Sequence, residues 1–77
     1  MKWNEVFDGV VVKDGYSMLA LVNDGEYWHA IIHRNNVTYE PWVFCTYYDI
    51  KDGTWGQGHY HSEYAHAVQD MAKYLAD

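Results

Sequence analysis

The histidines are the side chains of this sequence whose spacing could support chemistry. His59 and His61 stand two residues apart in a segment that we predict to be a strand, so their imidazoles should share one face. Three further histidines could add a metal ligand: His29, His33 and His66. A typical zinc site has two ligand pairs, usually with cysteine, and the single Cys45 is remote in sequence. We therefore predict no metal site and interpret the histidines as polar strand residues.

No other pattern in the sequence matches an active site. The glycines of segment 55–58 lack the Lys-Ser/Thr of a phosphate-binding loop, and neither Ser17 nor Ser62 stands in a nucleophile elbow. Carboxylates occur mostly in predicted turns, at Asp8, Asp14, Asp24 and Asp52. An acid-base pair would need two such turns to converge. We predict that the protein is not an enzyme and has no catalytic residues and no cofactor. The opposite hypothesis is a small metal-dependent enzyme built on the histidines.

The acidic composition limits the partners. Eleven Asp and Glu against five Lys and Arg give a formal net charge of −6. Phosphate backbones and anionic lipid headgroups repel such a protein, so we expect no direct binding to nucleic acid or membranes. A protein partner with a basic surface fits this charge better.

Length and cysteine content indicate a single domain, 1–77, in a reducing compartment. Hydrophobic residues make up 49% of the 77 residues and aromatic residues 18%, enough to build a small core. One cysteine forms no internal disulfide, so we expect a cytoplasmic protein in which Cys45 is a small buried hydrophobe. The longest apolar run, at 18–22, is too short to cross a bilayer, and the first residues lack the apolar run of a signal peptide.

Asp-Gly pairs divide the chain into strands. Four of the six glycines follow an aspartate, and Asp-Gly between apolar runs is a strong hairpin signal because both residues tolerate positive φ. The expected strands span residues 7–13, 16–23, 26–34, 37–48 and 55–61, and the fourth should have a bulge or an edge where Pro41 interrupts it. A helix should follow Ser62, with an apolar stripe of Tyr64, Val68, Met71 and Leu75. The predicted fold is α+β, with an antiparallel four- to five-stranded meander sheet and one C-terminal helix packed on one face.

The two faces of this sheet should differ. Segment 16–23 is mostly apolar and predicts a central strand, and Trp28, Ala30 and Ile32 share one face that we assign to the core. One short helix cannot cover both faces, so the other face should be open to a partner, where Tyr and Trp contribute most. The predicted partner-binding residues, which combine this face with the acidic turns, are Asp24, Glu26, Tyr27, His29, Ile31, His33, Trp42, Phe44, Tyr48, Asp52 and Trp55.

The C-terminal half resembles a group of small proteins. The segments that carry the resemblance are Trp42-Val43-Phe44, Tyr48-Asp49 and Asp52-Gly53-Thr54-Trp55-Gly56-Gln57-Gly58-His59-Tyr60, followed by Ala65 and Ala67. They are similar to small uncharacterised reading frames of phages and mobile elements. In size and acidity the chain also resembles phage-encoded anti-CRISPR inhibitors, many of which occupy the basic nucleic-acid or subunit surfaces of their targets. The resemblance implies an inhibitor in the cytoplasm of the host cell and brings no catalytic residues.

Together these patterns predict a small acidic binding protein that inhibits or modulates a protein partner, such as a nucleic-acid-binding complex of the CRISPR effector type. The aromatic face would anchor the partner, and the acidic turns would guide it electrostatically. The alternative is a structural homodimer or assembly module, in which the same face closes on a second copy.

Overall fold

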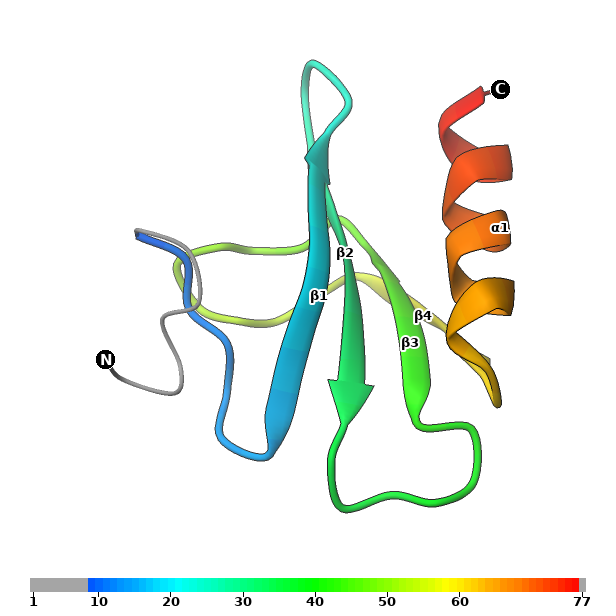
Figure 1. Cartoon of the computed structure of the whole chain (residues 1–77). Helices are drawn as coiled ribbons and strands as arrows, with labels where there is room; N and C mark the ends of the chain where they lie inside the picture. The colour runs from blue at the N-terminus through cyan, green and yellow to red at the C-terminus, as the bar shows by residue number, and fades with distance from the viewer. Residues whose placement is uncertain (1–8, 77) are drawn as a thin grey trace.

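The computed structural model describes residues 9–76, which form one antiparallel sheet and one helix (Figure 1). The elements are β1 (Tyr16–Asn23), β2 (Trp28–Arg34), β3 (Trp42–Thr46), β4 (Gln57–His61) and α1 (Tyr64–Ala76). The strands lie in the order β1-β2-β3-β4, so each one pairs with its neighbour in the chain. The predicted α+β fold, a meander sheet with a C-terminal helix packed against it, is confirmed.

Some predicted strand boundaries differ from the structure. Segment 16–23 matches β1, but residues 9–13 are irregular, and Phe7 and Asp8 of the expected first strand lie outside the described residues. Segment 37–41 is a connection rather than a strand. It ends at Pro41, whose carbonyl accepts a hydrogen bond from the Arg34 N–H at 2.8 Å. Proline has no N–H to donate to a ladder, so pairing of β3 begins at the next residue.

β1 lies at an edge of the sheet, which corrects its predicted central position. Leu19 is 45% exposed and Val22 is 36% exposed. The register with β2 shifts between Met18 and Ala20, so Leu19 is the extra residue of a β-bulge. β1 is apolar because its alternate residues pack against the two faces of the sheet. Among residues 9–76, no strand pairs with the outer edge of β1.

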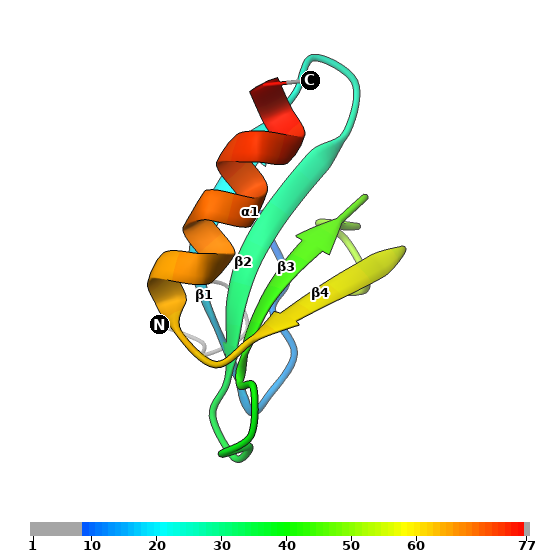
Figure 2. The same ribbon diagram turned by 90° about the vertical axis from the view of Figure 1, so that its right-hand side faces the viewer.

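The helix covers one face of the sheet and packs mainly against β3 and β4 (Figure 2). The hydrophobic cluster between the helix and this face of the sheet consists of Ile31, Phe44, Ala67 and Met71. Within α1 the buried residues are Ala67 and Met71, whereas Tyr64 and Val68 of the predicted stripe are about 40% exposed. The small side chain of Ala67 lets the helix approach the sheet, which rotates the contact away from that stripe.

The other face of the sheet is also covered, which corrects the expected open face. Its buried residues include Ala30, Ile32, Val43 and Cys45, with Val10 and Val12 from the irregular segment 9–13. Tyr48, Ile50 and Trp55 from the loop between β3 and β4 complete this cover. The prediction assumed that only a helix could shelter a face. Two irregular segments do so here, joined by hydrogen bonds from the Val11 N–H to the Ile50 carbonyl at 2.7 Å and from the Tyr48 hydroxyl to the Val11 carbonyl at 2.6 Å.

Candidate functional site

Four of the predicted partner-binding residues are core residues. His29, Ile31 and Phe44 are at most 1% exposed beneath α1, and Tyr48 is 4% exposed in the cover of the opposite face. The predicted alternation along β2 is correct, since His29 and Ile31 lie opposite to Ala30 and Ile32. The helix nevertheless packs on the side that we assigned to a partner. These four side chains cannot contact a partner in this conformation.

Other predicted residues fall into two groups on opposite faces of the sheet. His33 and Trp42 pack together on the helix side, with ring centroids 4.4 Å apart. Trp55 is half-buried in the cover of the opposite face, where it stacks on Tyr48 at 6.3 Å. Asp52 is exposed in the loop of that same cover. The predicted residues therefore do not form one continuous surface.

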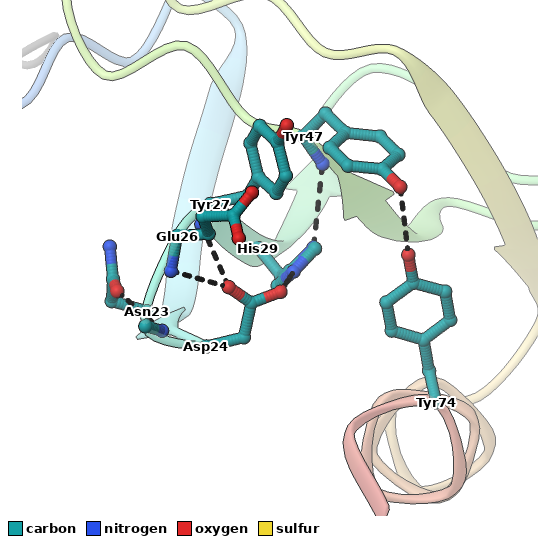
Figure 3. A network of polar contacts seen from close by, with 8 residues as sticks. Asn23, Asp24, Glu26, Tyr27, His29, Tyr47 and Tyr74 are labelled. Carbon is teal, nitrogen blue, oxygen red and sulfur yellow. Dashed lines mark hydrogen bonds and ion pairs between the residues drawn. The ribbon is translucent and has the colours of Figure 1, made fainter. Parts of the chain in front are cut away.

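Three predicted residues come together at the β1–β2 turn with two tyrosines that the prediction missed. We call this group the tyrosine patch, and it consists of Asp24, Glu26, Tyr27, Tyr47 and Tyr74 (Figure 3). Its members come from the β1–β2 turn, from the loop after β3 and from the last part of α1. Three segments that are distant in sequence thus contribute to one surface.

The Asp24 carboxylate organises the turn. Its Oδ1 accepts hydrogen bonds from the backbone N–H groups of Glu26 at 2.9 Å and Tyr27 at 2.7 Å, and its Oδ2 contacts His29 Nε2 at 2.8 Å. The hydrogen bond from His29, followed by those from the two backbone N–H groups, lowers the pKa of Asp24 from 3.8 to about 2. Asp24 therefore carries a fixed negative charge at any physiological pH.

The buried His29 side chain holds two segments of the patch in place, because it contacts both Asp24 and the backbone of Tyr47. The backbone N–H of Tyr47 donates to His29 Nδ1 at 3.4 Å, which requires the ring hydrogen to be on Nε2 and aimed at Asp24. The imidazole packs against the rings of Phe44 and Tyr74 at centroid distances of 6.4 Å and 5.2 Å. A fully buried imidazole therefore couples the hydrophobic core to the charged turn.

The two exposed rings of the patch meet at a right angle. Tyr27 and Tyr47 are each 49% exposed, and their ring centroids lie 4.9 Å apart with an interplanar angle of 84°. The Tyr74 hydroxyl donates to the Tyr47 hydroxyl at 3.5 Å, and this bond, with smaller contributions from burial and from the charge of Asp24, raises the pKa of Tyr74. The rings are thus placed by contacts with three elements.

Tyr47 could have been found from sequence only with difficulty. It follows β3 directly and adopts a φ of 54°, a left-handed conformation that is uncommon for a bulky residue. The run Trp42 to Tyr48 looks like uninterrupted strand, and no glycine or asparagine marks the reversal. The positive φ turns the Tyr47 ring toward Tyr27 and His29 instead of along the alternation of β3.

We expect that replacing Asp24 with asparagine destabilises the protein at neutral pH and much less in acid. Folding lowers the pKa of Asp24 from 3.8 to about 2, so its ionised form stabilises the folded state above pH 3.8. That contribution is lost as the pH falls toward 2. The difference in unfolding free energy between wild type and Asp24→Asn should shrink across this window, as measured by urea unfolding at stepped pH. A difference that stays constant would contradict the assignment.

A second polar cluster, which we call the histidine clamp, joins α1 to β4. His59 Nδ1 and His61 Nε2 contact the same Oδ2 of Asp70, at 3.0 Å and 2.9 Å. Both imidazoles share one face of β4, as the spacing predicts. Burial raises the pKa of Asp70, but the hydrogen bonds from His61 and His59 outweigh this and leave it lowered. The Asp70 carboxylate therefore connects the polar side of α1 to the neighbouring strand.

Replacing Asp70 with alanine should lower the free energy of unfolding by about 1 kcal/mol, because two hydrogen bonds between partly exposed side chains of α1 and β4 are lost. Thermal or urea unfolding followed by circular dichroism measures the change. The matched control is Gln69→Ala, on the adjacent and exposed position of the same helix. Alanine has a higher helix propensity than either residue, so propensity alone would raise the stability of both variants, and an equal loss in both would mean that the clamp does not account for the effect.

The lone thiol is a core group. Cys45 is fully buried, and burial raises the pKa of its thiol to about 12. At neutral pH it is therefore protonated and shielded from reagents. This confirms the interpretation of Cys45 as a small buried hydrophobe.

The tyrosine patch and the histidine clamp must be interpreted from their own geometry. No protein-family model, curated protein or solved structure matches the chain. Within residues 9–76, no group of three His, Cys, Asp or Glu side chains is arranged to hold a metal ion. In the same part of the chain, no helix has the length and apolar character needed to cross a membrane.

Proposed function

We propose that this is a non-enzymatic binding protein whose tyrosine patch docks on a basic surface of a protein partner. The observation that carries the proposal is the coincidence of exposed aromatic rings and unneutralised carboxylates on one preformed surface. The open aromatic face expected from sequence does not support it, because both faces of the sheet are covered. Recognition would depend on a small surface at one end of the sheet.

The electrostatics of the patch favour a cationic partner. Among the described residues, neither Asp24 nor Glu26 forms an ion pair with a lysine or arginine. The only titratable side chain that contacts the Asp24 carboxylate is His29. The formal charge of −6 adds long-range attraction to a basic surface. Tyrosine supplies large contact area with few rotatable bonds and is enriched among residues that dominate binding energy.

The class of partner that we propose is a protein whose basic surface binds nucleic acid, such as a CRISPR effector. A bound acidic protein would compete with nucleic acid for that surface, which is a direct route to inhibition. The resemblance to phage-encoded inhibitors in size and acidity agrees with this class of partner.

The proposal is tested by biolayer interferometry against a panel of purified CRISPR effectors and other basic nucleic-acid-binding proteins. We expect at least one to bind at micromolar concentration, with an association rate that falls as salt is raised from 50 mM to 500 mM. Pre-loading that partner with its nucleic acid should block binding. Lack of any micromolar partner, or binding that ignores both salt and nucleic acid, would contradict the proposal.

A second candidate function is homodimerisation through the outer edge of β1. The strand contains no charged residue, and Leu19 and Val22 are exposed along it. Natural edge strands usually carry charges that prevent pairing with another copy. Light scattering distinguishes the two functions: a dimer that a Leu19→Lys substitution converts to monomer would favour this second candidate.

A further inference from the structure

We infer that the tyrosine patch holds an arginine side chain of the partner, with the guanidinium against the rings of Tyr27 and Tyr47 and its N–H groups directed to Glu26. This inference rests on the proposed function and names the group that the patch recognises. It is carried by the two rings, by the free hydrogen-bond capacity of the Glu26 carboxylate and by the fixed negative charge of Asp24.

The rings form a corner in which a cation can lie. Tyr27 and Tyr47 meet at 84° with centroids 4.9 Å apart, and about half of each side chain remains exposed (Figure 3). A cation within about 6 Å of a tyrosine ring face is attracted by the ring quadrupole, which corresponds to about a two- to fivefold gain in affinity at an exposed site. A group lying in this corner would meet both rings at once.

The two carboxylates of the patch have different capacities for a new donor. Asp24 already accepts three hydrogen bonds, from two backbone N–H groups and from His29, so it acts as a fixed charge with little acceptor capacity left. The Glu26 carboxylate forms no hydrogen bond or ion pair with another described residue. Both of its oxygens are available to accept a pair of parallel N–H bonds.

These requirements fit arginine better than lysine. A guanidinium is planar, stacks on an aromatic ring and presents paired N–H groups that match a carboxylate. An ammonium is a compact and strongly hydrated charge that satisfies the carboxylate but gains less from the rings. The partner should therefore place an arginine, rather than a lysine, at this site.

The experiment is an NMR titration of the folded protein with a blocked pentapeptide of alternating Gly and Arg, followed through the aromatic ring signals of Tyr27 and Tyr47. The same peptide with lysine, and with citrulline as the neutral isostere of arginine, gives the comparison. We expect saturable shifts of both rings with arginine, about two- to fivefold weaker binding with lysine and no binding with citrulline. Equal shifts with citrulline, or no shift at millimolar arginine peptide, would overturn the inference.

Substitutions distinguish the contribution of the Tyr47 ring to arginine binding from that of the Glu26 charge. Tyr47→Phe should keep the arginine affinity, whereas Tyr47→Leu and Glu26→Gln should each lower it about two- to fivefold. The matched control Tyr39→Leu changes a 78% exposed ring outside the patch and should leave it unchanged. Full affinity of Tyr47→Leu would overturn the role of the ring.

Failure of this inference can be told apart from failure of the proposed function. If a nucleic-acid-binding partner is found but binds these variants as well as wild type, this inference fails while the proposed function stands. If the peptide binds but no such partner exists, the proposed function fails.

Discussion

Replacing Phe44 with alanine should lower the free energy of unfolding by about 3 to 5 kcal/mol, the largest effect that we expect from a single substitution in this protein. Phe44 is fully buried between the sheet and α1, and its ring packs against those of His29, His59 and Tyr74. At about 0.05 to 0.15 kcal/mol per residue, a 77-residue domain has a total stability of about 4 to 12 kcal/mol. The variant should therefore be marginally folded at 25 °C.

Urea unfolding followed by circular dichroism measures this loss. Tyr39→Ala is the matched control, because it removes an aromatic ring that is 78% exposed and should change the stability by less than about 0.5 kcal/mol. A loss below about 1 kcal/mol for Phe44→Ala would mean that the ring is not enclosed as described. Because Phe44 packs on His29, the variant should also loosen the tyrosine patch before the whole domain unfolds.

The double substitution Tyr27→Ala with Tyr47→Ala should weaken binding to a basic partner by about 30-fold or more, which corresponds to about 2 kcal/mol. Both rings are half-exposed at the centre of the patch, so their removal takes away much of its contact area. The effect should appear mainly in the dissociation rate, whereas changes at Glu26 should alter the association rate and its salt dependence.

The control for this result removes two exposed tyrosines elsewhere. Tyr39 and Tyr60 are 78% and 44% exposed and lie outside the patch, so the variant Tyr39→Ala with Tyr60→Ala should bind like wild type. Both double variants must keep the wild-type circular dichroism spectrum, which shows that the fold is retained. Equal binding by the two double variants would place the docking surface elsewhere on the molecule.

The site depends on the core through a short chain of contacts. Phe44 packs on His29, His29 contacts Asp24 at 2.8 Å, and Asp24 holds the backbone of the turn that carries Glu26 and Tyr27. A buried polar group of this kind is costly when a partner is missing. The same contacts that stabilise the β1–β2 turn therefore keep the patch in one arrangement before a partner arrives.

Local rules in the sequence determined the type and approximate position of four strands and the helix, but not the irregular conformation of residues 9–13 and 37–41. The Asp-Gly pairs at Asp14-Gly15 and Asp24-Gly25 mark turns in which both glycines have positive φ, and the segment between them is β1. The alternation of β2 follows from the period of a strand, and the helix follows Ser62 as predicted, but it buries Ala67 and Met71 rather than the whole expected stripe. The Asp-Gly turns favour antiparallel neighbours, and the structure adds the strand order β1-β2-β3-β4.

Only the tertiary structure decided which faces these elements bury and where the candidate site lies. Alternation says that His29 and Ala30 lie on opposite faces, but it does not say which face receives the helix or that the irregular segment 9–13 covers the other. The patch joins Tyr27, Tyr47 and Tyr74 through contacts between residues 20 and 27 positions apart in the chain. Such contacts depend on how the elements pack in three dimensions, and sequence periodicity describes each element only by itself.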